Sequence, residues 1–161
     1  MNKALRRIQD ELAAGRNVLV TTSGVSMEPL LHDKHKKNAT RVLIEPSVGA
    51  CKIGDMPLVR MEEGKYFLHR IIRIEEKQDE TYYITRGDNC ITTETVPSER
   101  VLGVVTDIYY PTHQLSVNDR RYRIYIKIWT IIYPLRKLYK KSRNFCGKCK
   151  RFLVAKRKNI G

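Results

Sequence analysis

Apolar residues along most of this chain come in short bursts, and each burst is followed by residues that favour a turn. Segments rich in Val, Ile, Tyr and Phe predict six strands, at residues 17–22, 40–44, 55–61, 65–75, 80–86 and 100–110. The breaks contain good turn formers, such as Gly87, Asp88 and Asn89. Short strands at this spacing favour an antiparallel arrangement. We therefore expect a mainly β fold, built as a coiled antiparallel sheet or small barrel.

Two segments have the helical period instead. Leu5, Ile8 and Leu12 predict a short helix over residues 1–14, which Gly15 would end. In residues 119–141 the apolar positions repeat at intervals of three and four residues, with aromatic and basic side chains beside them. This apolar stripe consists of Ile124, Ile128, Ile131, Leu135 and Leu138. It predicts a partly amphipathic helix, which Pro134 should kink or divide.

Charge separates this C-terminal segment from the rest of the chain. Of the 31 Lys and Arg residues, 15 lie in residues 120–161, where no acidic residue occurs, so this part carries +15. The other 16 basic residues and all 17 acidic residues lie in the first 119 residues, whose net charge is −1. We therefore divide the chain into a nearly neutral domain, residues 1–118, and a basic extension, residues 119–161.

The sequence favours a protein of a reducing compartment. Residues 1–16 lack the apolar run of a secretory signal, and residues 124–135 are fewer than the roughly 20 that a membrane-spanning helix needs. The cysteines form no disulfide framework, because Cys51 and Cys90 are isolated and a single pair remains, Cys146 and Cys149, whose role stays open. We expect a cytoplasmic protein that is peripheral on the inner membrane face.

The candidate chemistry starts at Ser26, which follows Gly24 and precedes Pro29. A serine is a weak nucleophile near neutral pH and needs a base within hydrogen-bond reach. His69 lies on a predicted strand, and an imidazole with an ordinary pKa of about 6.5 is largely neutral at pH 7 and can take the proton. Asp88 is a candidate to orient that imidazole, although its surroundings are equally ordinary turn composition. Serine, histidine and aspartate, the residue types of a serine hydrolase triad, thus follow one another in this order along the chain.

Several short motifs, in order, resemble the successive boxes of signal peptidase I. They are SGVSMEPLL at residues 23–31, GDMPLVR at 54–60, YFLHRII at 66–72, TRGDN at 85–89 and LGVV at 102–105. The resemblance covers roughly residues 17–110 and is to the archaeal and endoplasmic-reticulum branch, in which a histidine replaces the lysine base. This family shares a clan with LexA-like self-cleaving repressors. The resemblance implies a mostly β, coiled fold in which the substrate lies extended along a strand beside the nucleophile.

By this resemblance, Ser26 attacks the scissile carbonyl, and His69 takes its proton and returns it to the leaving amine. The backbone N–H of Ser26 would meet the oxyanion. The further candidates for the substrate or oxyanion site are Gly24, Met27 and Pro29. The histidine branch also uses an aspartate downstream of Asp88, where this chain offers only Glu94. The third member of the triad therefore stays open.

Each candidate residue also has a plainer explanation. A serine in a glycine-containing turn is usually structural, and a histidine on an apolar strand is usually a core residue, so the interpretation depends on the combination of motifs. We expect a serine endopeptidase that trims a precursor or leader peptide. The alternatives are a non-catalytic module of the same fold that binds peptide by strand addition, and a self-cleaving regulator. No cofactor and no metal is expected, because a zinc site would have to combine His32 and His35 with Cys146 and Cys149.

The basic extension admits three interpretations. Its apolar stripe, aromatic margins and many Lys and Arg residues fit an anionic membrane surface, bound through residues 120–158. The same composition can bind nucleic acid, but no base-reading motif is present, so we expect no nucleic-acid partner. In the third interpretation the stripe packs on the sheet and the last 20 residues form a solvated end. The other expected partner is the precursor peptide itself.

Overall fold

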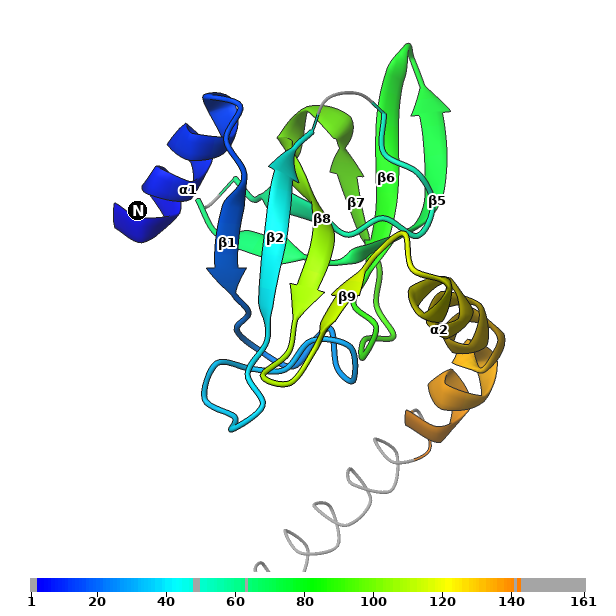
Figure 1. Cartoon of the computed structure of the whole chain (residues 1–161). Coiled ribbons are helices and arrows are strands. Elements are labelled where there is room, and N and C mark those ends of the chain that lie inside the picture. The colour runs from blue at the N-terminus through cyan, green and yellow to red at the C-terminus, as the bar shows by residue number, and fades with distance from the viewer. Residues whose placement is uncertain (1–2, 48–49, 63, 141, 143–161) are drawn as a thin grey trace, which may run out of the picture. The chain divides into compact units, whose positions relative to one another are not determined.

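The computed structural model describes residues 3–47, 50–62, 64–140 and 142. These residues form two antiparallel sheets and three short helices, so the predicted mainly β, coiled fold is confirmed (Figure 1). In chain order the elements are α1 (Lys3–Ala13), β1 (Val18–Thr21), β2 (Arg41–Pro46), β3 (Pro57–Arg60), β4 (Tyr66–Leu68), β5 (Arg70–Lys77), β6 (Glu80–Arg86), β7 (Glu94–Pro97), the 3₁₀ helix η1 (Ser98–Arg100), β8 (Val101–Tyr109), β9 (Gln114–Ser116) and α2 (Arg120–Ile131).

The larger sheet curls into half a barrel. Its strand order is β1-β2-β8-β3-β4, with β9 paired to β8, and all of these pairs are antiparallel. The register of β8 shifts against both β2 and β3, which is typical of the bulges that bend a sheet. Among the described strands, β1 pairs only with β2 and β4 only with β3. These two strands are therefore the edges of the curled sheet.

The smaller sheet has the order β5-β6-β7. Its hairpin turns at Gln78 and Asp79, whose φ angles of 50° and 63° lie in the left-handed region. The single strand predicted over residues 65–75 is in fact two strands, because the chain leaves the larger sheet after Leu68 and enters the smaller sheet at Arg70. His69 therefore lies at the junction of the two sheets. The strands β7 and β9 were not predicted.

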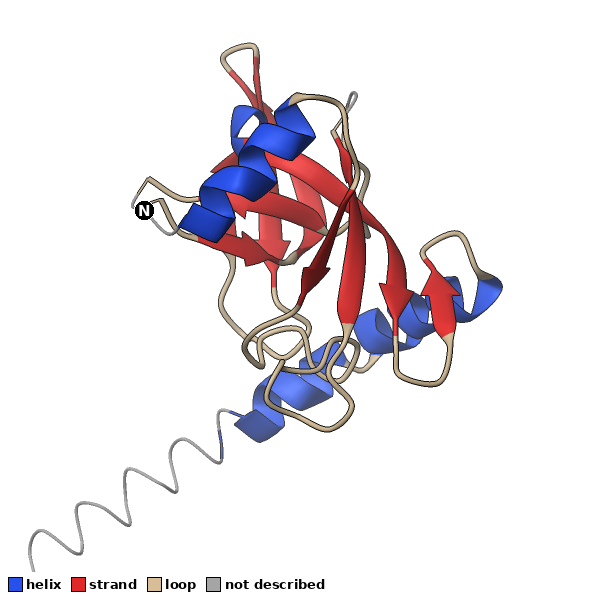
Figure 2. Ribbon diagram, turned by 60° about the vertical axis from the view of Figure 1, so that its left-hand side comes forward, coloured by secondary structure: helices blue, strands red, loops and turns tan. Residues whose placement is uncertain are grey.

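Helix α1 covers part of the larger sheet, where it packs on β1, β2 and β8 (Figure 2). Leu12 is buried in this contact, as its place in the helical period predicts. The centre of the larger sheet is apolar, and its fully buried side chains include Val42, Ile44, Val59 and Ile108.

The chain separates into two compact units, residues 1–125 and 126–161. Helix α2 crosses this boundary, so its first residues belong to the first unit. The helix is interrupted at Ile132, and the chain is helical again over residues 133–140 with Pro134 near the start, which agrees with the predicted division. In the described part of the chain, no helix combines the length and the apolar content that a bilayer crossing requires.

Candidate active site

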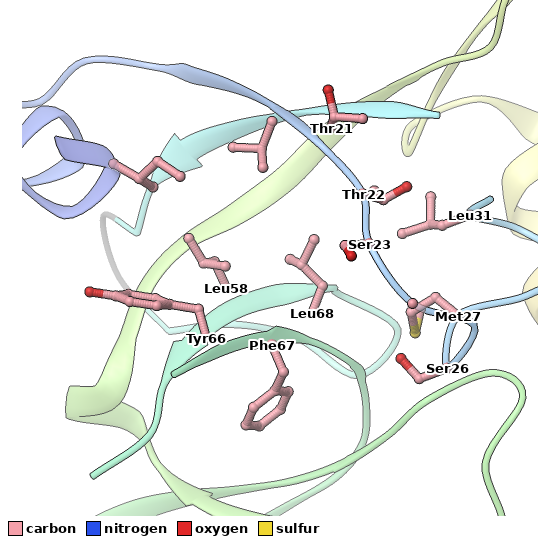
Figure 3. Close-up of a pocket in the computed structure, with 13 residues that line it drawn as sticks. Thr21, Thr22, Ser23, Ser26, Met27, Leu31, Leu58, Tyr66, Phe67 and Leu68 are labelled. Carbon is pink, nitrogen blue, oxygen red and sulfur yellow. The ribbon is translucent and has the colours of Figure 1, made fainter. Parts of the chain in front are cut away.

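An apolar pocket of about 230 Å³ lies between the two edge strands of the curled sheet. Val20 and Thr21 of β1 line one side, and all three residues of β4 line the other. The rest of the lining comes from α1, β3 and the loop after β1, and consists of Ile8, Leu58, Thr22, Ser23, Gly24, Ser26, Met27 and Leu31. Figure 3 shows Tyr66 at one end of the pocket and Ser26 at the other. The pocket is thus an apolar groove with Ser26 at its end.

Ser26 lies in the long loop between β1 and β2. The two ends of this loop are tied together, because the Thr22 hydroxyl donates to the His32 carbonyl oxygen at 2.7 Å and lies 2.7 Å from the Thr40 hydroxyl. Gly24 has a φ of 90°, a conformation that glycine adopts without steric cost. The turn that presents Ser26 therefore depends on a glycine two residues earlier, as the motif suggested.

A carboxylate holds the backbone just before Ser26. Asp33 accepts the N–H of Gly24 and, at 2.9 Å, the N–H of His35. These two backbone donors hold the pKa of Asp33 below its usual range, and the bond from Gly24 has the larger effect. The N–H of Gly24, a candidate residue of the substrate or oxyanion site, is therefore already bonded to Asp33. Neither the N–H nor the hydroxyl of Ser26 has a hydrogen-bond partner among the residues that the structure describes.

His69 is held by a carboxylate on one side and an aromatic ring on another. Its side chain is 10% exposed, its Nδ1 lies 3.0 Å from Oε2 of Glu94, and its ring centroid lies 4.8 Å from that of Phe67. An ionised carboxylate only accepts hydrogen bonds, so a neutral imidazole here carries its hydrogen on Nδ1 and its lone pair on Nε2. Glu94, the first residue of β7, therefore sets the tautomer that a general base requires.

The close approach of Ser26 to His69 depends on Gly87. A Cβ at Gly87 would lie 2.6 Å from the Ser26 carbonyl oxygen, 2.9 Å from the Cys90 sulfur and 3.1 Å from Nε2 of His69. Only a residue without a side chain leaves room for all three. The basic nitrogen of His69 and the backbone of Ser26 thus border the same small space. Within the described chain, however, the Ser26 hydroxyl makes no hydrogen bond to the imidazole.

Asp88 has a different partner from the one expected. Arg70 donates from Nε to Oδ1 at 2.8 Å and from Nη2 to Oδ2 at 2.7 Å, and the two side chains are only 6% and 3% exposed. Burial disfavours the Arg70 cation, but the hydrogen bonds and charge of Asp88 outweigh it and raise the pKa of the guanidinium. The carboxylate at Nδ1 of His69 belongs to Glu94, and Asp88 is instead one half of a buried ion pair.

The expected substrate residues are placed unequally. Met27 is buried at the end of the groove, and its sulfur accepts the N–H of Asp88 at 3.4 Å. Pro29 is exposed and is not part of the pocket lining. Gly24 lines the pocket, although its N–H is occupied. Of the three, Met27 and Gly24 border the space that a ligand would enter.

Three residues beside the site were not predicted: Arg70, Tyr122 and Tyr125. Arg70 carries a sequence signal, because an arginine next to His69 in an otherwise apolar strand requires a buried partner. The tyrosines carry no such signal, since they lie in the segment that charge and period assigned to a separate extension. Their contacts bring the start of α2 to the ion pair of Arg70.

Among the described residues, no group of three or more His, Cys, Asp or Glu side chains is placed to hold a metal ion. His32 and His35 lie in the loop after β1, but Cys146 and Cys149 lie outside the described residues, so the zinc alternative is not addressed by the structure. The side chains that remain as candidates for chemistry at this site are Ser26, His69 and Glu94.

Comparison with known proteins assigns no family to the chain. A scan against protein-family models and a search of curated proteins both find no match.

Proposed function

We propose that the protein is a serine endopeptidase of the type suggested by the resemblance to signal peptidase I. The observation that supports this proposal best is the His69–Glu94 hydrogen bond, which leaves the basic Nε2 facing the space beside Ser26. A histidine that served only as a core residue would need neither this tautomer nor an adjacent serine at the end of a groove. In this proposal Ser26 is the nucleophile, His69 the general base and Glu94 the orienting carboxylate.

The proposed reaction follows from these positions. Ser26 Oγ attacks the scissile carbonyl carbon while His69 Nε2 takes the hydroxyl proton. His69 then gives this proton to the leaving amine, the bond between carbon and nitrogen breaks, and the carbonyl carbon stays bound to the serine as an ester. Water then attacks the ester by the same general-base route. The Ser26–His69 hydrogen bond forms in this scheme when substrate expels water from the groove, since catalytic hydrogen bonds often tighten only in the complex.

The developing oxyanion would be met by the N–H of Ser26, which lacks a partner among the described residues. One such donor is typically worth about 3 kcal/mol of the barrier. Asp33 supports this arrangement indirectly, because it fixes the Gly24 backbone two residues earlier.

The substrate that fits the groove is an extended peptide segment. β1 and β4 border the groove and each has one unpaired edge among the described strands, so a peptide between them can bond to both backbones. The apolar lining favours apolar side chains along that segment. A leader or another segment of a dedicated precursor, held extended for cleavage, has this form.

Cleavage by matched serine variants tests the proposal. The purified protein is incubated with candidate leader peptides and with a fluorophosphonate probe, which labels activated serines, and the products are followed by mass spectrometry. Ser26→Ala should abolish cleavage and labelling, and His69→Gln should lower both by about 10²- to 10⁴-fold. Ser23→Ala, which removes another hydroxyl from the same pocket, should retain activity. Equal cleavage by wild type and Ser26→Ala contradicts a peptidase.

A second candidate, a non-catalytic peptide-binding module, is favoured by one observation. Within the described chain the Ser26 hydroxyl makes no hydrogen bond to His69, as a pure binding groove would allow. Isothermal titration with the same peptides separates the two candidates. Binding without cleavage, unchanged in Ser26→Ala, would support the module, whereas binding by Ser26→Ala and cleavage by wild type support the peptidase.

The proposal includes a place of action, a membrane surface rich in anionic lipid. The two helical segments, residues 126–131 and 133–140, expose apolar side chains among basic ones: Ile128 (52%), Ile131 (75%), Leu135 (71%) and Leu138 (68%). Arg136 lies over the ring of Trp129, with its guanidinium carbon 3.7 Å from the ring centroid. Aromatic, apolar and basic side chains that occur together on helical segments are typical of interfacial membrane binding.

Vesicle flotation tests this part of the proposal. We expect flotation with vesicles that contain phosphatidylserine, weaker flotation as salt rises, and none with phosphatidylcholine alone. The double change Ile131→Ser with Leu135→Ser should abolish flotation, and Ile53→Ser, at a site 65% exposed in the other unit, should not. Flotation that is equal with both lipids, or unchanged in the double variant, contradicts it.

A further inference from the structure

The Arg70–Asp88 ion pair lies between the two halves of the candidate active site. Arg70 directly follows His69 in the chain, so its position fixes the backbone of the base. Asp88 directly precedes Asn89, whose N–H donates to the Ser26 carbonyl oxygen at 2.7 Å and whose side chain donates to the Val25 carbonyl oxygen at 3.0 Å. The ion pair therefore connects His69 to the Ser26 loop through neighbouring residues in the chain and hydrogen bonds.

This ion pair is buried, and it needs further hydrogen bonds to be stable. Two charges out of water are tolerated only when their remaining donors and acceptors are satisfied. Arg70 Nη1 donates to the Gly54 carbonyl oxygen at 2.9 Å and to the Tyr122 hydroxyl at 2.7 Å. The Tyr125 hydroxyl donates to Oδ2 of Asp88 at 3.0 Å. Arg70 and Asp88 thus each form a hydrogen bond with one tyrosine hydroxyl.

Both tyrosines come from the first turns of α2, far along the chain from their partners. Tyr122 is 3% exposed, and burial raises the pKa of its hydroxyl, so it stays a neutral donor and acceptor. The guanidinium carbon of Arg70 also lies 5.4 Å from the ring centroid of Tyr122 and 5.9 Å from that of Tyr125, within cation–π range. The start of α2 therefore covers the ion pair and bonds to both of its ends.

We propose that Tyr122 and Tyr125 are positioning residues, which set the distance between Ser26 and His69 by holding the Arg70–Asp88 pair in place. This inference rests on the proposed function for its catalytic consequence, but the structural link exists whether or not the site is a peptidase. Neither tyrosine touches the groove, whose lining comes from α1, β1, β3, β4 and the Ser26 loop. Their loss should therefore change the alignment of the catalytic groups and leave peptide binding intact.

Tyrosine-to-phenylalanine variants test the link without depending on catalysis. The first readout is amide hydrogen exchange at Asn89, whose N–H is bonded to Ser26. Tyr122→Phe and Tyr125→Phe should each speed this exchange, by roughly 3- to 10-fold, which corresponds to one lost hydrogen bond. Tyr82→Phe is the matched control, because it removes a hydroxyl that bonds to Glu80 on the exposed hairpin of the smaller sheet. Exchange at Asn89 that is no faster than in Tyr82→Phe overturns the proposal.

The second readout is a kinetic split. Tyr125→Phe should lower kcat about tenfold, with KM and the shape of the pH–rate profile unchanged, because the groove and the His69–Glu94 bond are intact. A rise in KM at constant kcat, or an unchanged kcat despite faster exchange, overturns the positioning role. If wild type cleaves no peptide and takes no serine probe, the peptidase proposal fails by itself, and the exchange data still decide whether the tyrosines hold the Ser26 loop.

Discussion

At the scale of single residues, Glu94 has the clearest chemical consequence, because it selects the His69 tautomer. Replacement by glutamine keeps the size of the side chain but lets its amide donate to Nδ1, which would move the imidazole hydrogen to Nε2. The base would then face Ser26 with a hydrogen and no lone pair. We expect Glu94→Gln to lower kcat by about 10²- to 10⁴-fold with little change in KM.

Steady-state cleavage of a leader peptide measures this effect. Glu99→Gln, an equivalent change in the nearby helix η1, is the control and should leave kcat unchanged. Full activity in Glu94→Gln would mean that the 3.0 Å contact to His69 has no role in orienting a base.

Asp33 should make the stability of the fold depend on pH in the acid range. Its pKa is lowered in the folded protein because the backbone N–H groups of Gly24 and His35 bond to the ionised carboxylate. The bonds therefore stabilise the fold above the unfolded pKa of about 3.9, and this contribution is lost as pH falls through the lower folded pKa. We expect Asp33→Asn to be less stable than wild type near neutral pH, with a difference that disappears in acid.

Urea unfolding followed across the acid range measures this difference. Asp79→Asn is the control, because an asparagine tolerates the positive φ of that turn and the turn lies on the distant hairpin. A stability difference between wild type and Asp33→Asn that stays constant with pH would contradict the assignment of the effect to the Asp33 carboxylate.

The sequence indicates the candidate nucleophile and base more readily than the residues that hold them. Ser26 and His69 each lie in a local motif, so reading neighbouring residues sufficed to propose them. Which carboxylate contacts His69 depends on the tertiary structure. Asp88 and Glu94 lie close together in the chain, and only the path of β7 decides which of them reaches the imidazole. Arg70 could have been suspected from its charge alone.

At the scale of elements, the curled sheet explains why a groove exists. Five predicted strands correspond to β1, β2, β3, β6 and β8, because each has a run of branched or aromatic residues between clear turns. The break at His69 was missed, since residues 65–75 show no turn residue where the chain passes from one sheet to the other. The strands β7 and β9 were also missed, because they are short and polar and are formed by pairing with a neighbour.

The two edge strands predict how a bound peptide is held. If a peptide bonds to β1 on one side and β4 on the other, successive amides point alternately to the two edges, and each finds a partner. Methylation of a single backbone nitrogen should then raise KM by roughly 2- to 10-fold at odd and even positions alike within the groove. A peptide with one paired edge would show the effect only at alternate positions.

An N-methyl scan of one cleaved peptide, by steady-state kinetics, measures this pattern. Methylation at positions outside the groove is the internal control and should not change KM. No effect at any position would contradict strand addition.

At the scale of the whole molecule, the first unit is joined internally by the buried pair of Arg70 and Asp88. Arg70 belongs to the smaller sheet, while the Gly54 carbonyl that it bonds to precedes β3 of the larger sheet. The same guanidinium bonds to Tyr122 of α2. One ion pair thus links both sheets and the start of the C-terminal helix. Residues 119–125 thus belong to the first unit, seven residues beyond the boundary predicted at residue 118.

The energetic weight of that link can be measured by removing one charge and then both. Arg70→Met leaves the Asp88 carboxylate buried without a counter-charge, so we expect the free energy of unfolding to fall by about 3–5 kcal/mol. Adding Asp88→Leu should restore most of this loss, because an apolar pair of similar volume needs no desolvation of charge. The urea midpoint at constant m-value reports both changes. If the double variant is no more stable than Arg70→Met, the uncompensated charge is not the cause of the lost stability. If the double variant is stable but inactive, the ion pair has a role in aligning Ser26 with His69 that is separate from its role in folding.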